Sequence, residues 1–184
     1  MKKTIKTVLL ASLLIVFGCK ETSENATAST TENTESKAAG QEGVIDDTSA
    51  RNIVQTAIGS KDHTTLVTAV KTADLVTSLS NAGPFTVFAP TNAAFAKLPS
   101  GTVEGLLKPE KKADLQNILG YHTYVGTLKT EYMQDGQEYD MVFGGKVKIT
   151  KKGDKTFVNG SEILASIPTS NGIIHVIGDV LLPK

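Results

Sequence analysis

Apolar side chains recur at helical spacing through the middle of the chain, which predicts a series of short amphipathic helices. One helix is expected over residues 50–58, closed by Gly59, and a second follows Asp62, which can cap its N-terminus. Asp74 can cap a third short turn, and Pro109 suits the first turn of a later helix. The side chains expected on the buried faces of these helices are Ile53, Val54, Ala57, Ile58, Leu66, Val67, Val70, Leu75, Val76, Leu79, Leu115, Ile118 and Leu119.

A strand is predicted over residues 85–89, because this run between two prolines is apolar and rich in β-branched and aromatic side chains. Thr91 or Asn92 can cap the helix that follows it. Its expected buried side chains are Ala94, Phe95 and Leu98.

Beyond Gly120 the apolar spacing becomes that of β-strands. Residues 121–128 look extended, and residues 146–150 alternate apolar and polar side chains as a half-exposed strand does. Asn159-Gly160 and Asn171-Gly172 are turn signals. Further strands are expected at residues 155–158, 161–166, 173–177 and 180–182. Because the helices lead and the strands follow, the predicted fold class is α+β.

The N-terminus has the pattern of a secretory signal, because three lysines precede an apolar run that ends at Phe17. This run is too short to span a bilayer as a helix. The small Gly18 before Cys19 indicates a bacterial lipoprotein signal over residues 1–18, with cleavage before Cys19 and lipid on that cysteine. The alternative is an ordinary secreted protein with a chance cysteine. We therefore expect an exported protein, lipid-anchored to a bacterial membrane at the outer membrane or cell surface.

Residues 19–48 contain almost no large apolar side chain, so they are expected to form a flexible tether. Residues 49–184 are long enough for one domain with its own core. Without residues 1–18 the chain has 16 basic and 19 acidic residues, a formal charge of −3, which gives no electrostatic case for nucleic acid. Cys19 is the only cysteine, so no intrachain disulfide is expected.

Three segments of this pattern resemble the sequence motifs of fasciclin-type domains, in the order found in that family. They are residues 83–95 (Gly-Pro-Phe-Thr-Val-Phe-Ala-Pro-Thr-Asn-Ala-Ala-Phe), Leu119–His122, and residues 171–183 (Asn-Gly-Ile-Ile-His-Val-Ile-Gly-Asp-Val-Leu-Leu-Pro). The resemblance implies a fasciclin-like β-sandwich wedge of about seven strands, with several helices packed at one side. Gly120 departs from the family pattern, which often has a larger apolar residue there.

The structural residues that the resemblance implies are Thr91, Asn92, Asn171, Gly172 and His175. It also suggests that His122 bonds to groups near the first motif, with Thr91 or Asn92 as candidates. We expect His122 and His175 within apolar strands, where each buried ring nitrogen needs a partner. His63 lies near a helix start and is expected to be solvated. The three histidines lack close ligand spacing, so no metal and no cofactor are expected.

The residues best placed for partner contact are Ile118, Tyr121, His122 and Tyr124, because in adhesive relatives this element is linked to receptor contact. The alternative is that they all belong to the core. A catalytic cysteine and a Gly-x-Ser-x-Gly elbow are both missing from the sequence, so an enzyme is not expected.

The resulting hypothesis is a membrane-anchored cell-surface adhesion or interaction module that presents its domain to a protein or polysaccharide partner. A monomer or weak self-association is expected. The first alternative is an envelope small-ligand-binding protein, which requires a deep apolar cavity. The second is a hydrolase using His122 or His175, which requires an exposed imidazole beside an acid and a nucleophile.

Overall fold

The computed structural model describes residues 50–183. The predicted signal peptide, Cys19 and the tether lie outside the described residues. The helices are α1 (Ile53–Ile58), η2 (Lys61–His63), α2 (Thr64–Thr72), α3 (Val76–Ser80), α4 (Asn92–Ala96), α5 (Thr102–Leu106), η3 (Pro109–Lys111) and α6 (Lys112–Tyr121). The strands are β1 (Phe85–Pro90), β2 (Thr123–Val125), β3 (Glu138–Asp140), β4 (Lys146–Lys152), β5 (Lys155–Val158), β6 (Ser161–Thr169) and β7 (Gly172–Ile177).

The seven strands form one sheet in the order β2-β1-β7-β6-β5-β4-β3. Only one neighbouring pair, β1 and β7, is parallel, and every other neighbouring pair is antiparallel. The backbone N–H of Val142, just after β3, donates to the carbonyl of Thr123 in β2 at 3.0 Å. This bond brings the two ends of the sheet together, so the sheet is nearly a closed barrel. The predicted α+β class with about seven strands is confirmed.

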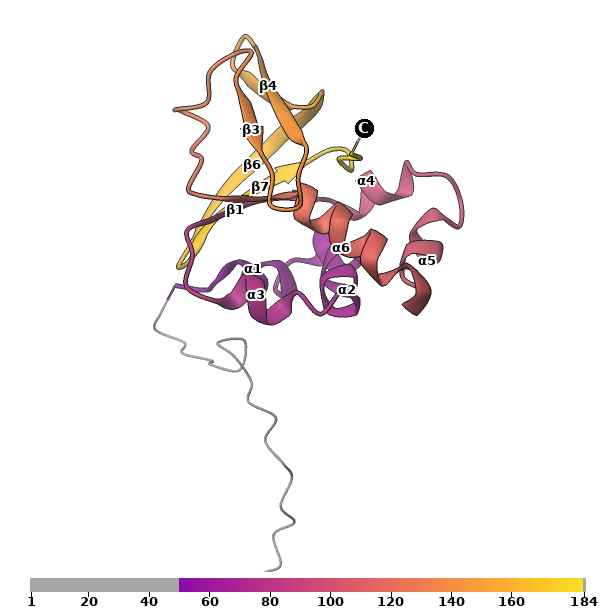
Figure 1. Ribbon diagram of the computed structural model, residues 1–184. Helices are drawn as coiled ribbons and strands as arrows, with labels where there is room; N and C mark the ends of the chain where they lie inside the picture. Colours follow the sequence, from indigo (N-terminus) through magenta and orange to yellow (C-terminus); the bar gives the residue numbers. More distant parts are fainter. Residues whose placement is uncertain (1–49, 184) are drawn as a thin grey trace, which may run out of the picture. The chain divides into compact units, whose positions relative to one another are not determined.

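Two hydrophobic cores lie on opposite faces of the β1–β7 pair. On one face, Val87, Ala89 and Ile174 pack against helices α1, α2, α3 and α6. On the other face, Phe88 and Ile177 pack against side chains from α6 and from strands β4 and β5. Figure 1 shows the helices gathered on one side of β1 and β7, with the β3–β4 hairpin on the other. Burial on both faces explains why these two strands read as nearly continuous apolar runs.

Helix starts follow the capping rules, but two predicted caps are wrong. Asn52 and Gln55 form a reciprocal capping box at α1, and the Thr91 hydroxyl accepts from Ala94 N–H at the start of α4. Ser60, not Asp62, caps the turn that precedes α2, through the N–H of Asp62. The predicted cap at Asp74 is also wrong. Asp74 adopts a left-handed conformation (φ 56°) after α2, and its carboxylate binds Lys112 of α6.

The extended segment predicted from Tyr121 to Leu128 is also wrong at its start. Helix α6 continues through Tyr121, and His122 is its C-terminal cap, so β2 is only three residues long. The predicted strand at residues 180–182 does not form, and helix α5 and strand β3 were not predicted. These short elements carry too few residues for a periodic pattern, so packing decides them.

Within residues 50–183, no helix combines the length and the apolar character needed to cross a membrane.

Candidate functional site: the Tyr121–His122 element and its rim

Tyr121 lies at the C-terminal end of α6 and points into the core beside β4. Its hydroxyl donates to the carbonyl of Lys146 at 2.7 Å and accepts from the Asn159 side-chain amide at 2.9 Å. Both hydrogen-bonding roles of the phenol are therefore satisfied inside the protein, and the residue is only 4% exposed. Tyr121 thus joins α6 to the β4–β5 part of the sheet.

His122 is buried, at 2% exposure, and bonds to two backbone groups. Its Nδ1 lies 2.8 Å from the carbonyl of Ile118, and its Nε2 lies 2.9 Å from the N–H of Leu181. Because a carbonyl can only accept, Nδ1 carries the proton and Nε2 accepts from Leu181. The predicted partners Thr91 and Asn92 are wrong, since His122 instead joins α6 to the C-terminal segment.

This arrangement leaves no place for a second proton on the His122 ring. Burial removes the imidazolium from water and, against the smaller opposing effect of the Ile118 carbonyl, lowers the pKa of His122 to about 4. Protonation would also direct an N–H of the ring at the N–H of Leu181. The neutral ring is therefore part of the folded structure.

Acidification is expected to destabilise the domain through His122. The unfolded chain takes up this proton near pH 6.5, whereas the folded domain does so only near pH 4. Stability that is fully present above pH 6.5 is therefore lost as the pH falls towards 4, by about 3 kcal/mol at pH 4. Urea unfolding of the protein and of His122→Gln at pH 7, 5.5 and 4 measures this. Equal pH slopes in both proteins would contradict the expectation.

Asn92 and Thr91 organise the start of α4. The Asn92 side-chain oxygen accepts from Thr65 N–H and the Thr64 hydroxyl, and its amide donates to the Lys61 carbonyl. Asn92 therefore joins α4 to the turn that leads into α2.

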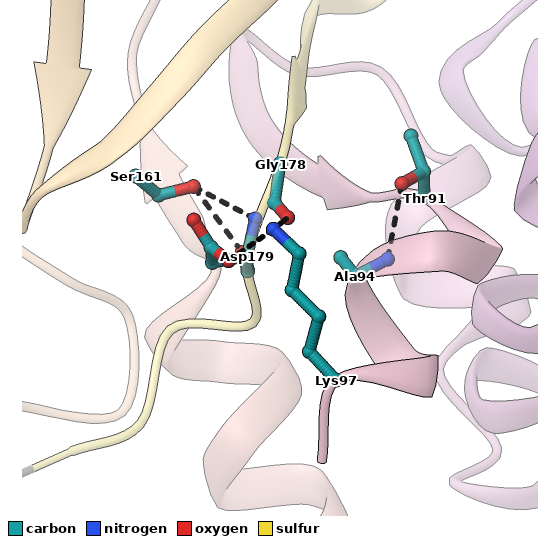
Figure 2. A network of polar contacts seen from close by, with 6 residues as sticks. All are labelled: Thr91, Ala94, Lys97, Ser161, Gly178 and Asp179. Atoms are coloured by element: carbon teal, nitrogen blue, oxygen red, sulfur yellow. Dashed lines mark hydrogen bonds and ion pairs between the residues drawn. The ribbon is translucent and has the colours of Figure 1, made fainter.

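Helix α4 is also tied to the segment after β7 (Figure 2). Lys97 donates to the carbonyl of Gly178 at 2.8 Å and binds the Asp179 carboxylate at 2.6 Å. The Asp179 N–H donates to the Ser161 hydroxyl at 2.9 Å. Since the Lys97 and Asp179 side chains are 60% and 50% exposed, their ion pair adds little stability, and the bonds mainly fix the path of the chain towards Leu181.

Asn171 connects four segments through one buried side chain. Its oxygen accepts from Ile53 N–H at 2.9 Å, and its amide donates to the carbonyls of Leu79 and Asn81, both at 2.8 Å. Its own carbonyl accepts from Phe85 N–H at 3.1 Å. The residue thus holds α1, the end of α3 and the start of β1 at the β6–β7 turn, and every polar atom of its side chain has a partner.

His175 lies in β7, as predicted, and is completely buried. Its Nε2 lies 2.7 Å from the carbonyl of Leu128, so it donates there, and its Nδ1 accepts from the Ser166 hydroxyl at 2.8 Å. Burial lowers its pKa. The Thr86 hydroxyl accepts from Leu128 N–H at 2.9 Å. Thr86 and His175 together hold the loop that follows β2.

The Ser166–His175 pair does not have the arrangement of a catalytic dyad. The imidazole has no exposed surface, and its far nitrogen binds a carbonyl where a carboxylate would be needed to orient it. His122 is also buried, so the exposed imidazole that the hydrolase alternative requires is not found at either residue.

His63 is buried, which makes the expectation of a solvated ring wrong. Its Nδ1 lies 2.8 Å from the Ser60 hydroxyl, and burial lowers its pKa. The Asp62 carboxylate and, less, the Ala89 backbone oppose that shift, and Nε2 has no hydrogen bond of ordinary geometry. Within the described part of the chain, no three His, Cys, Asp or Glu side chains gather in a way that could hold a metal ion.

Tyr121 and His122 are themselves buried, so the accessible surface near them is formed by neighbouring residues. A Cβ on Gly120 would lie 1.6 Å from the Phe143 ring, so this ring occupies the space of the side chain that glycine lacks. Phe143 nevertheless stays 53% exposed, and Val142 and Val125 are also exposed, at 44% and 61%. We call Val125, Val142 and Phe143 the apolar rim. Ile118 and Tyr124 are half-buried.

Two residues of the apolar rim, Val142 and Phe143, were missed in the sequence because they lie in a loop without periodic spacing. The signal in the sequence was Gly120 itself. A glycine on the buried face of a helix leaves a space, and in a close-packed core a side chain from elsewhere must fill that space. Of the four predicted contact residues, Tyr121 and His122 are inaccessible in this structure. A partner role for Ile118 and Tyr124 stays a prediction.

Two apolar crevices lie between the helices and the sheet, and both are lined by Leu66, Leu119 and His122. Each has a cavity volume of about 30 Å³, enough for roughly two water molecules. Neither offers the deep cavity that the small-ligand alternative requires. A wider, open and more polar depression of about 430 Å³ lies along α4 and α5.

Comparison with known proteins agrees with this geometry. The sequence profile of the Fasciclin domain family matches residues 61–183. The chain is 46% identical over 153 residues to Protein sll1483 of Synechocystis sp., covering 83% of each chain. It is 35% identical over 114 residues to human Periostin, covering 61% of this chain and 13% of Periostin.

A solved structure also matches, that of a FAS1 domain pair from the insect cell adhesion molecule Fasciclin I. Its TM-score is 0.62 at 16% identity, and the match covers 73% of this chain and 51% of that chain. At this identity the match supports the fold alone.

Proposed function

Because this chain belongs to the Fasciclin domain family, we propose that it is a cell-surface adhesion or interaction module that presents its domain to a protein or polysaccharide partner. The observation that carries this proposal is the contrast between the hydrogen-bonded, buried side chains of the Tyr121–His122 element and an exposed apolar rim. The imidazoles of His122 and His175 and the phenol of Tyr121 are all committed to internal hydrogen bonds. What remains for a partner is the outer surface.

The apolar rim is the part of that surface best suited to contact. Val142 and Phe143 stand on a turn that is fixed at both ends, by Val142 N–H on Thr123 and by Met141 N–H on Gly145. Exposed apolar and aromatic side chains held on a rigid support lose little conformational entropy on binding. Phenylalanine is also among the residues that are enriched at the core of protein–protein interfaces.

The proposed membrane anchor is lipid on Cys19, after removal of residues 1–18. Acyl chains contribute roughly 0.8 kcal/mol per buried methylene, so more than one chain holds a protein stably on a membrane. Residues 19–48 would give the domain reach from the surface, and many copies on one membrane would raise the avidity of weak contacts. Labelling with radioactive palmitate in cells tests the anchor, and label that persists in Cys19→Ala would contradict it.

Replacing the apolar rim is expected to weaken cell attachment. The variant Val142→Ser/Phe143→Ser should reduce attachment or aggregation of cells by about fivefold, because each truncation removes contact area at the proposed interface. Ile58→Ser is the matched control, since Ile58 is 52% exposed on α1, away from the rim. Attachment is counted for a deletion strain complemented with each form, and circular dichroism verifies folding. Equal attachment by the deletion strain and the wild type would overturn the proposal.

A further inference from the structure

The open depression along α4 and α5 has the volume of a ligand site. Its volume of about 430 Å³ lies within the range of roughly 300–1,000 Å³ that ligand pockets occupy. The lining comes from α2, α4, α5 and the turn that joins α4 to α5. No residue of the apolar rim is among the described residues that line it, so the two surfaces are separate.

Four polar side chains of this lining have hydrogen-bonding capacity that the protein does not use. In the described part of the chain, the hydroxyls of Thr65 and Ser100 and the carboxylate of Glu104 have no hydrogen-bond or ion-pair partner. The Asn92 amide donates one N–H to the Lys61 carbonyl, and its second N–H has no acceptor. The depression therefore offers both donors and acceptors to a polar ligand.

The lining also has an apolar part, formed by Phe95, Leu98 and Pro99. Phe95 and Leu98 are half-buried, so packing holds their side chains while part of each stays accessible. Asn92 is held as well, because its side-chain oxygen accepts from Thr65 N–H at 3.0 Å. Groups that are held in place before a ligand arrives lose little conformational entropy on binding.

Charge narrows the class of ligand. Glu104 is the only charged residue among the described residues that line the depression. Lys97 follows Ala96 in the sequence but binds Gly178 and Asp179, away from the lining. A phosphate, sulfate or acidic sugar would thus find no cation to pair with, and Glu104 would repel it. The lining favours a neutral ligand that donates hydrogen bonds.

We propose that this depression, which we call the α4–α5 site, binds a segment of a neutral polysaccharide. A pyranose ring carries hydroxyls around its edge, which match the free polar groups, and C–H groups on its faces, which match the Phe95 ring. Glu104 accepts from sugar hydroxyls, since hydrogen bonds to a charged acceptor are strong. Glycoside hydrolysis uses a pair of carboxyl groups, so this single carboxylate indicates binding without cleavage.

A peptide fits the α4–α5 site less well. Peptides are recognised by an open strand edge, by an apolar groove that takes one face of a helix, or by a cluster of arginines. The described lining consists of helices and a turn, carries free polar groups beside its apolar part, and contains no arginine.

Binding to oligosaccharides tests the proposal in the chain without residues 1–18, kept free of lipid by Cys19→Ala. An immobilised panel of neutral and acidic oligosaccharides is probed, and the neutral member with the strongest signal is titrated by calorimetry. Ala96→Trp should raise its Kd by about tenfold or more, because a large side chain then occupies the site. Ala93→Trp, also exposed on α4 but outside the lining, is the matched control and should leave Kd unchanged.

The charge argument has its own variant, Glu104→Gln. It should raise the Kd for the same oligosaccharide by about fivefold, because a charged acceptor binds a hydroxyl more strongly than a neutral one does. Glu110→Gln is the control, since Glu110 is exposed in η3 and does not line the site. Circular dichroism verifies that each variant is folded.

Several results would overturn the proposal. They are no binding by any neutral oligosaccharide of the panel, tighter binding by the acidic members, and equal Kd values for Ala96→Trp and Ala93→Trp. Binding of an immobilised peptide library that Ala96→Trp abolishes, with no oligosaccharide bound, would assign the site to a protein partner instead. The apolar rim is unchanged in every variant, so these results leave the cell-attachment test independent.

Discussion

Replacing Asn171 with leucine is expected to lower the free energy of unfolding by about 4 kcal/mol, because three backbone groups, two of them buried, lose their partners at about 1–3 kcal/mol each. Those groups are Ile53 N–H and the carbonyls of Leu79 and Asn81, and leucine can bond to none of them. Domains of this size have total stabilities of about 5–15 kcal/mol, so most of the stability would be lost. Urea denaturation followed by circular dichroism gives the value.

The control is Asn117→Leu, the same substitution at an exposed position of α6. It should change the free energy of unfolding by no more than about 0.5 kcal/mol. A loss below about 1 kcal/mol in Asn171→Leu would mean that water replaces the lost bonds, and that Asn171 does not hold the segments together.

The second large effect is expected from Gly172→Ala, which should destabilise the domain by about 4 kcal/mol or more. A Cβ at this position would lie 1.9 Å from the carbonyl oxygen of Phe85 and 2.8 Å from its carbonyl carbon. These are backbone atoms of β1, so no side-chain rotation can relieve the contact. The parallel β1–β7 pair, which aligns Phe85 with Gly172, would have to separate.

Gly178→Ala is the matched control, because a Cβ there has no heavy atom within 4 Å. Its free energy of unfolding should stay within about 0.5 kcal/mol of the wild-type value. Thermal and urea unfolding of both variants, measured side by side, separate a general effect of added methyl groups from the clash with β1. Equal stability of the two variants would show that β1 moves away from β7 at little cost.

Local signals in the sequence were enough for the elements with long or distinctive patterns. Strands β1 and β7 were predicted from uninterrupted apolar runs. The alternation over residues 146–150 predicted a strand with one buried and one exposed face. Thr91 was among the predicted caps because a hydroxyl before a helix satisfies a free N–H. The same rule gave wrong caps at Asp62 and Asp74. Several short polar residues near each helix start can act as the cap, and the final path of the chain decides which of them does.

The buried histidines show the limit of that reasoning. An isolated sequence indicates that an imidazole needs two partners, but not which carbonyl or N–H lies beside it. The partners of His122 are Ile118, four residues before it, and Leu181, 59 residues after it. Only the folded chain brings Leu181 to that ring, and only burial then lowers the pKa.

The sequence by itself determined the family, the α+β class, the turns at Asn159 and Asn171, and the expectation of an exported, tethered domain, because each depends on residues close together in the chain. The tertiary structure alone decided that Tyr121 and His122 face inward, that Phe143 covers Gly120, and that residues of α2, α4 and α5 line one open depression. These features depend on which distant segments meet, and contacts between distant segments arise from the packing of the whole domain.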